Sequence, residues 1–227
     1  MVSNETTIGK PTPGRAAGGS SGSAGNEGPR RGPLPDGEIE YEASFSKSRI
    51  LTWFLLLVVV MTFGGVIGAY VVISTNGVLE WRPFALPFQV WISTLIILAS
   101  SVTYYFAERS VRSADQRSSK KWLAVTTALG ATFVSSQVLA WWALVQRGVY
   151  LQSNPYAGFF YILTALHAIH VAGGIIALGY LVLMVWERER FDAGIDRIRD
   201  VASAVGWYWH FMGVLWIVLF ILLGFWK

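Results

Sequence analysis

The sequence predicts an all-α fold: a polytopic membrane protein with five transmembrane helices. Hydrophobic residues make up 53% of the 227 residues, and the mean hydropathy is +0.46. Apolar runs of about 20 residues or more recur along the chain, which is the length that crosses the hydrocarbon core of a bilayer. These runs are too long and too uniformly apolar for barrel strands, and only helices or closed barrels satisfy the backbone in lipid.

Each run has boundaries that local signals support. The first ends at the turn signal Asn76-Gly77, and the second follows Leu86-Pro87, with Pro87 suited to the first turn of a helix. Eight tryptophans fall near run ends, where indoles prefer the headgroup level; they are Trp81, Trp91, Trp122, Trp141, Trp142, Trp186, Trp207 and Trp226. The predicted spans cover residues 51–75, 87–107, 122–146, 157–186 and 201–226.

The chain divides into an arm and a membrane domain. Residues 1–45 are rich in Gly, Pro, Ser and charge, a composition that predicts a disordered cytoplasmic arm without a cleavable signal. Residues 46–227 are expected to form the five-helix membrane domain. With no cysteine, disulfides, thiolate metal sites and cysteine nucleophiles are excluded. The formal charge of +4 does not indicate nucleic-acid binding, because the basic residues lie in loops between apolar runs.

The distribution of basic residues predicts the orientation. Fifteen of the eighteen Lys and Arg residues lie before the first span, around residues 108–121 or around residues 187–200, and the other side has only Arg82, Arg147 and Lys227. Cytoplasmic loops carry the excess of positive charge. We therefore expect a cytoplasmic N-terminus and a C-terminus on the outside.

Charge is nearly absent from the spans. Glu108 and Glu187 lie at span ends, beside Arg109 and Arg188, and are interpreted as interfacial ion pairs. A transporter or ion pump normally has an ionisable residue at mid-depth on its pathway, so this pattern argues against an independent transport mechanism.

The histidines are the remaining candidates for chemistry. His167 and His170 lie on one helical face, so they cannot ligate one haem from opposite sides, and a haem would need one of them together with His210. A non-haem metal held by all three stays an alternative, although further ligands at membrane depth are missing. We favour a structural role, in which neutral imidazoles form hydrogen bonds between helices.

Other small or polar residues favour helix packing. The third span carries a stripe of hydroxyl and amide side chains, and the second span carries serines and threonines, all suited to interhelical contact. Gly64 and Gly68 form a G-x-x-x-G pair, with Gly65 and Ala69 one residue on, which would let the first helix approach a neighbour closely.

Two segments resemble conserved motifs of subunit III of haem–copper oxygen reductases. FYILTALHAIHVAGG, at 160–174, is similar to that family's F-Y-x-x-T-G-x-H-x-x-H-V-x-x-G signature, and GWYWHFMGVLWIVLF, at 206–220, is similar to its closing W-Y-W-H-F segment. The order and spacing agree, and Leu86-Pro87 matches a further landmark. The likeness spans residues 51–227, and the bacterial form of the family has five helices.

The resemblance implies a non-catalytic accessory subunit of a proton-pumping respiratory oxidase in the bacterial inner (cytoplasmic) membrane. Such a subunit has no redox centre of its own, flanks the catalytic subunit I, holds phospholipid and supports proton uptake, while haem and copper reside in partner subunits. Cytochrome c is the expected donor. No catalytic, cofactor or metal residue is therefore expected here, and the structural candidates are His167, His170, Thr164, Gly174, Trp207, Tyr208, Trp209, His210, Trp216 and Gln137.

This sequence departs from the family pattern at four acidic positions. The family's carboxylates correspond here to Val59, Ala140, Ser203 and Gly213. Their loss argues against a proton-antenna role inside this subunit and leaves scaffolding and lipid binding intact. Two alternatives stay open, namely the same role in a quinol oxidase and a small membrane haem- or metal-binding protein. The arm is a candidate contact for a further respiratory complex.

Overall fold

A computed structural model describes residues 36–76, 81–187, 191 and 194–226, with side chains described at 50 and from 52 onward. These residues form helices and connecting segments, and no strand occurs among them. The helices are α1 (Asp36–Thr75), α2 (Phe88–Arg112), α3 (Gln116–Gln146), α4 (Pro155–Trp186) and α6 (Ile195–Phe225). Within the described chain, five helices are long and apolar enough to cross a membrane, which confirms the predicted fold class.

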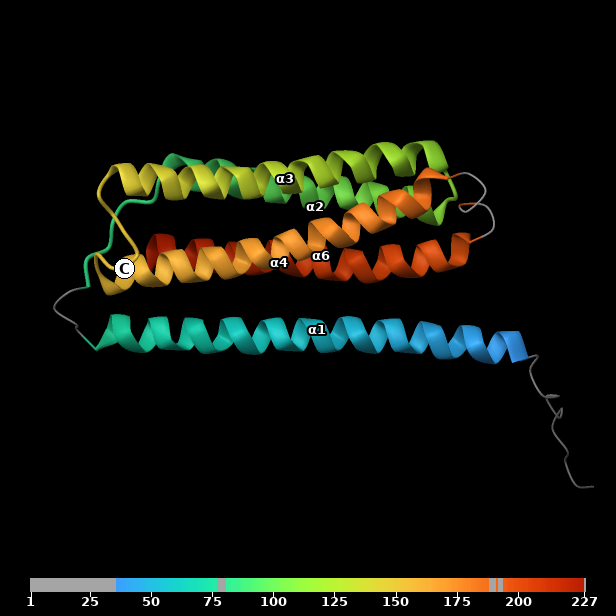
Figure 1. Ribbon diagram of the computed structural model, residues 1–227, viewed down its shortest axis with the longest axis horizontal. Coiled ribbons are helices and arrows are strands. Elements are labelled where there is room, and N and C mark those ends of the chain that lie inside the picture. The colour runs from blue at the N-terminus through green and yellow to red at the C-terminus, as the bar shows by residue number, and fades with distance from the viewer. Residues whose placement is uncertain (1–35, 77–80, 188–190, 192–193, 227) are drawn as a thin grey trace, which may run out of the picture.

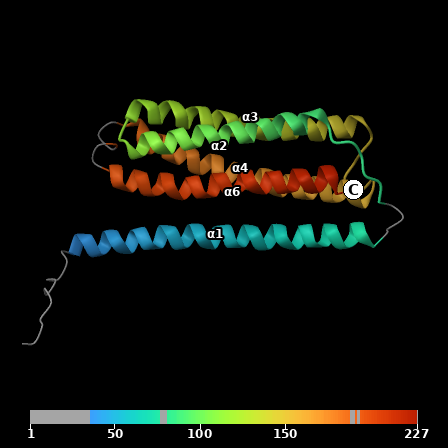
Figure 2. The ribbon, with the colours of Figure 1, turned by 180° about the vertical axis from the view of Figure 1, so that it is seen from behind.

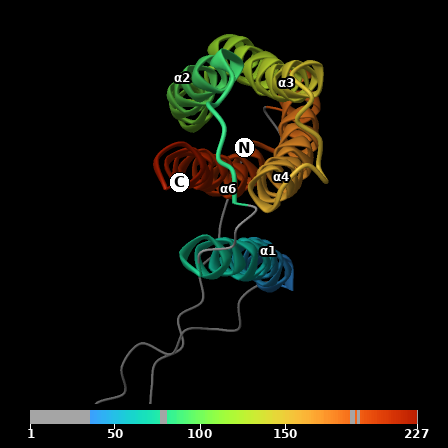
Figure 3. The ribbon, with the colours of Figure 1, turned by 90° about the vertical axis from the view of Figure 1, so that its left-hand side faces the viewer.

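Four of these helices form a bundle, and the fifth lies beside it. Figures 1 and 2 show α2, α3, α4 and α6 running alongside one another, with α1 parallel to them on one side. In the end-on view of Figure 3, α1 lies outside the bundle, next to α4 and α6. The core of the bundle therefore lies between α2, α3, α4 and α6, and α1 covers only part of its surface.

The helices extend beyond the predicted apolar runs. α2 continues to Arg112, α3 begins at Gln116 and α6 begins at Ile195. Hydropathy locates the segment in hydrocarbon, whereas the hydrogen-bonded helix continues until a capping residue ends it. Asp115 caps α3 by accepting from the Ser118 N–H at 3.1 Å, and such caps lie outside the apolar run.

One local prediction about a helix start is corrected. Pro87 is the N-cap of α2, with ψ of 146°, and does not lie in the first turn. The prolyl ring restricts only φ, so this extended conformation is fully compatible with it. Pro155 instead occupies the first helical turn, at the start of α4, after the N-cap Asn154 accepts from the Ala157 N–H.

α1 begins within the segment that was expected to be disordered. Its first residue is Asp36, so residues 36–45, which the sequence assigned to the arm, belong to this helix. These residues lack the prolines of the preceding segment, which allows the helix to continue upstream of the apolar run. Residues 1–35 lie outside the described residues.

The two ends of the bundle differ in charge and in aromatic content. The end of α2, the start of α3, the end of α4, the start of α6 and the start of α1 all lie at one end (Figure 1), and most of the described basic residues belong to these segments. At the other end, Tyr70 packs against Trp81, with ring centroids 5.2 Å apart, and donates to the Trp226 carbonyl at 2.6 Å. This aromatic cluster attaches α1 to α6.

Candidate functional site

Trp209 is a buried candidate residue that contacts three other helices. Its indole is 1% exposed and donates through Nε1 to Ser100 Oγ on α2 at 3.1 Å. Its six-membered ring lies directly over Gly130 on α3 and Gly174 on α4. A Cβ added at Gly130 would be 2.7 Å from Trp209 Cη2, and one at Gly174 would be 3.1 Å from Trp209 Cε3. A side chain at Gly130 would therefore clash with the indole, and one at Gly174 would require its neighbours to give by a few tenths of an ångström.

His167 lies inside the bundle but does not form the expected interhelical hydrogen bond. Its side chain is fully buried, and neither ring nitrogen has a partner in the protein. The ring instead packs among aromatic neighbours from three helices: Phe63, Phe133 and Trp216, at centroid distances of 6.4, 5.7 and 5.1 Å. The prediction of a bridging imidazole is thus wrong for His167, because its neighbours present ring faces and edges instead of acceptors.

His170 bonds to its own helix and reaches α6 through its backbone. Its Nδ1 lies 2.7 Å from the Leu166 carbonyl oxygen, one turn earlier on α4. The Tyr208 hydroxyl donates to the His170 carbonyl oxygen at 2.8 Å, which links α6 to α4. Phe63 of α1 packs edge-on against the imidazole at 5.5 Å.

His210 lies apart from the other two histidines, half-buried against α2, where its ring packs edge-on to Tyr104 at 5.8 Å. Across the part of the chain that the structure describes, no three His, Cys, Asp or Glu side chains come together as metal ligands. The three histidines therefore act as separate packing residues in this geometry.

A layer of polar side chains joins all four bundle helices. Gln137 Nε2 donates to Ser93 Oγ at 2.7 Å, and Trp216 Nε1 donates to Thr94 Oγ1 at 3.0 Å. Nearby, Trp141 Nε1 donates to Thr164 Oγ1 at 3.1 Å. These polar side chains thus form hydrogen bonds between helices, the kind of contact that the sequence led us to expect of them.

Other members of the α3 stripe behave differently. The Thr126 and Thr103 hydroxyls lie 2.9 Å apart and link α3 to α2. Thr127, Thr132 and Ser135 each donate to a carbonyl of α3 itself, four residues earlier. A hydroxyl that finds no facing helix returns to its own backbone in this way. The stripe is only partly interhelical.

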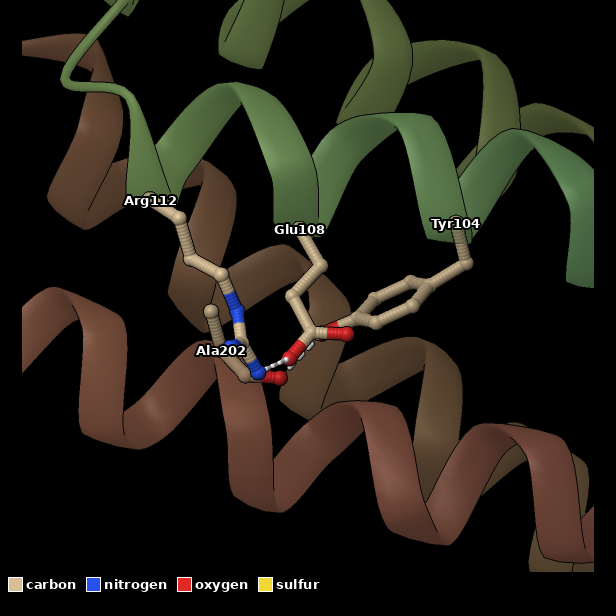
Figure 4. A network of polar contacts seen from close by, with 4 residues as sticks. All are labelled: Tyr104, Glu108, Arg112 and Ala202. Carbon is tan, nitrogen blue, oxygen red and sulfur yellow. Dashed lines mark hydrogen bonds and ion pairs between the residues drawn. The ribbon is translucent and has the colours of Figure 1, made fainter.

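Tyr104 is a structural residue that the sequence pattern did not single out. It is fully buried, and its hydroxyl donates to the Ala202 carbonyl oxygen of α6 (Figure 4). In the same view Glu108 forms an ion pair with Arg112 at 2.6 Å, one turn along α2. The predicted pairing of Glu108 with the adjacent Arg109 is wrong, because residues four apart share a helical face and neighbours do not.

Trp207 and the glycines of α1 face away from the interior. Trp207 is 65% exposed, and its ring lies 6.3 Å from that of Trp53. A Cβ added at Gly64, Gly65 or Gly68 would meet nothing within 4 Å. The G-x-x-x-G face of α1 therefore makes no close helix contact within the described chain and is open to a neighbouring molecule.

An apolar pocket of about 260 Å³ lies between α1, α4 and α6. Small residues of α4 and α6 form its floor, and α1 forms the opposite wall; the lining residues are Thr52, Leu55, Gly173, Ala177, Ala204, Val205 and Tyr208. The Tyr208 hydroxyl is already bonded to His170. The pocket therefore offers an almost entirely hydrocarbon surface.

The positions of the family's missing acids lie in apolar or tightly filled surroundings. Val59 is 1% exposed and Ala140 is fully buried. At Gly213 an added Cβ would be 3.1 Å from Ser101 Oγ, so the interior has closed around the smaller residue. These positions contribute packing and no ionisable group.

Comparison with known proteins agrees with this architecture. The family model described as cytochrome c oxidase subunit III matches residues 52–227. A cytochrome c oxidase subunit 3 of Thermostichus vulcanus is 33% identical over 168 residues, covering 72% of this chain and 79% of that protein. A cytochrome c oxidase subunit 3 of Corynebacterium diphtheriae is 33% identical over 171 residues, covering 73% and 81% respectively. The match begins where α1 enters the predicted membrane segment and includes all five helices, so the chain belongs to the cytochrome c oxidase subunit III family.

Proposed function

We propose that this chain is the non-catalytic accessory subunit of a proton-pumping haem–copper terminal oxidase. In this role it stabilises the catalytic subunit I, binds lipid and supports proton uptake while the complex reduces oxygen with electrons from cytochrome c. The observation that carries the proposal is the match of residues 52–227 to the cytochrome c oxidase subunit III family model. Within this matched region, buried polar side chains such as Gln137 and Trp209 join helix to helix, as a scaffolding role requires.

The proposal includes an orientation in the bacterial inner (cytoplasmic) membrane. The basic residues at the end of α2 and at the starts of α3 and α6 lie at the same end of the bundle as the start of α1. Because the cytoplasmic segments of membrane proteins carry the excess of Lys and Arg, we assign this end of the bundle to the cytoplasmic side. The chain contains no cysteine, so the single-cysteine variants Ser113→Cys and Gln152→Cys can be labelled from each side of the membrane to test this assignment. The Ser113→Cys variant should be labelled only from the cytoplasm. Labelling of Ser113 from the outside would reverse it.

Lipid binding is assigned to the pocket between α1, α4 and α6. Inside the membrane an apolar pocket of this kind is matched by one lipid acyl chain, which buries hydrocarbon without a polar penalty. Replacing Ala204, in the pocket floor, by Leu should reduce the lipid that co-purifies with the complex, as measured by native mass spectrometry. Ala99→Leu, at an exposed position of α2, is the matched control. Equal lipid content in both variants would remove this assignment.

Co-purification tests the subunit role itself. When a tagged form of the chain is expressed in its native host and purified, haem- and copper-containing subunits should co-purify with it. The haem spectrum should remain with these partner subunits after this chain has been removed. A Soret band from the isolated chain would instead support the haem-protein alternative. Activity with quinol but not with cytochrome c would assign the same accessory role to a quinol oxidase.

A further inference from the structure

Two fully buried side chains in the bundle retain hydrogen-bonding atoms that no protein group satisfies. Gln137 Oε1 has no partner, and neither do Nδ1 and Nε2 of His167. Both residues have no exposed surface. Buried amide oxygens and imidazole nitrogens are normally bonded, because leaving them unpaired forfeits their hydration without replacement.

The two side chains lie in the same layer of the bundle. On α3, Gln137 is one turn from Phe133, whose ring packs on His167, and one turn from Trp141, which donates to Thr164. His167 and Thr164 are themselves one turn apart on α4. Because α3 and α4 run antiparallel, Gln137 is level with the stretch of α4 between Thr164 and His167.

Neighbouring donors in this layer are already in use. Ser93 Oγ accepts from Gln137 Nε2 and donates to the Val90 carbonyl. The Trp216 indole N–H points to Thr94, although its ring lies 5.1 Å from that of His167. The free acceptor of Gln137 and the nitrogens of His167 therefore need a group from outside the polypeptide.

We propose that this layer binds an internal water molecule that donates to Gln137 Oε1 and pairs with a ring nitrogen of His167. Water suits the two groups that it would join, because it can donate to the amide oxygen of Gln137 and either donate to or accept from one nitrogen of the neutral His167 ring. A partner side chain cannot serve, since neither residue reaches the surface. A metal ion lacks ligands, because the described residues contain no group of three His, Asp or Glu. The inference concerns the interior of this chain and does not depend on the proposed accessory role.

A double-mutant cycle in the assembled complex tests the shared water. Gln137→Leu and His167→Leu should each lower the equilibrium retention of the chain by about three- to tenfold, as expected for a lost buried polar contact. Each change removes the water's bridge, so the double variant should lose clearly less than the product of the two single effects. The control cycle combines Gln137→Leu with Thr126→Val, which removes the Thr126–Thr103 contact three turns away, and these two effects should multiply. Independent effects of Gln137→Leu and His167→Leu would overturn the proposal.

A map of the unmodified complex at a resolution that shows ordered water provides the second test, which holds even if the leucine variants fail to assemble. Density is expected within hydrogen-bonding distance of both Gln137 Oε1 and one His167 nitrogen. If the His167 ring instead turns to bond the Leu163 carbonyl, as His170 bonds Leu166, with no density beside Gln137, the proposal fails.

Discussion

Replacing Gly130 by alanine should destabilise the bundle because it forces the Trp209 indole out of its position. The new Cβ would lie 2.7 Å from Trp209 Cη2 and 3.1 Å from Cζ2. Carbon atoms in contact are separated by about 3.5–4.0 Å, so the ring must move by roughly 1 Å. Trp209 is 1% exposed and its Nε1 is held by Ser100, so it has little room to do so. Overpacking of this kind costs about 1–3 kcal/mol.

The cost of Gly130→Ala can be compared with the cost of alanine at two other glycines. It can also be tested by asking whether a second substitution, in Trp209, restores stability. Gly174→Ala, with its nearest contacts at 3.1 Å, should cost less than Gly130→Ala, and Gly179→Ala, where nothing lies within 4 Å, should cost nothing. Trp209→Phe removes Cη2 and Cζ2, the atoms that clash. The double variant Gly130→Ala/Trp209→Phe should therefore be more stable, by at least about 1 kcal/mol, than the two separate losses imply.

Thermal dissociation of the chain from the purified complex, followed by gel filtration, measures these differences. The midpoint temperature of dissociation should be highest for Gly179→Ala, lower for Gly174→Ala and lowest for Gly130→Ala. Equal midpoints for the three alanine variants, or strictly additive losses in the double variant, would show that the indole does not define the spacing of these helices.

Two further changes probe contacts at the helix ends. Tyr156→Phe removes the hydroxyl donor to the Leu223 carbonyl and should cost about 0.6–2 kcal/mol in the same dissociation assay, whereas Tyr180→Phe, at an exposed position, should be neutral. Asp115→Ala should increase hydrogen exchange at the Ser118 amide, while Asp115→Asn should preserve only part of the protection, because it keeps the acceptor but loses the charge. The Ser118 hydrogen bonds hold the pKa of Asp115 below its usual range. The charged cap therefore contributes above the unfolded-state pKa, and protection should fall as the pH drops through the lower folded-state pKa; pH-independent exchange protection would contradict this.

The membrane fold could be predicted from the sequence because span length and polarity are properties of single segments. Five apolar runs of the right length necessarily become helices in lipid, and they do so here. Helix ends were less predictable from hydropathy, since α3 begins at Gln116 and α6 at Ile195, outside the hydrocarbon-length runs. The start of α3 depends on its cap, Asp115, which a capping search would have found, whereas Gly194 before α6 forms no side-chain cap bond.

The site could be predicted only in part, because contact partners depend on how helices cross. Trp209, Gln137 and Thr164 were expected to be structural, and each contacts another helix. Their partners could not be derived from one sequence, since many serines and threonines were equally suitable. Glycine shows the limit most clearly: Gly130 lies beneath an indole, whereas Gly64 faces open space, and nothing in the local pattern separates them.

The outlying position of α1 has a consequence for how the protein is made. α1 is synthesised first, yet the helices it contacts, α4 and α6, are made last. It must therefore enter the bilayer and remain there alone while about a hundred residues of chain follow it out of the ribosome. Its composition suits that interval, because its span has the highest mean hydropathy of the five described, 2.5, although the smallest share of it, 22%, is finally covered by protein. Contact with lipid alone thus stabilises α1 after its insertion, and its contacts with the bundle are complete only once α6 has been synthesised.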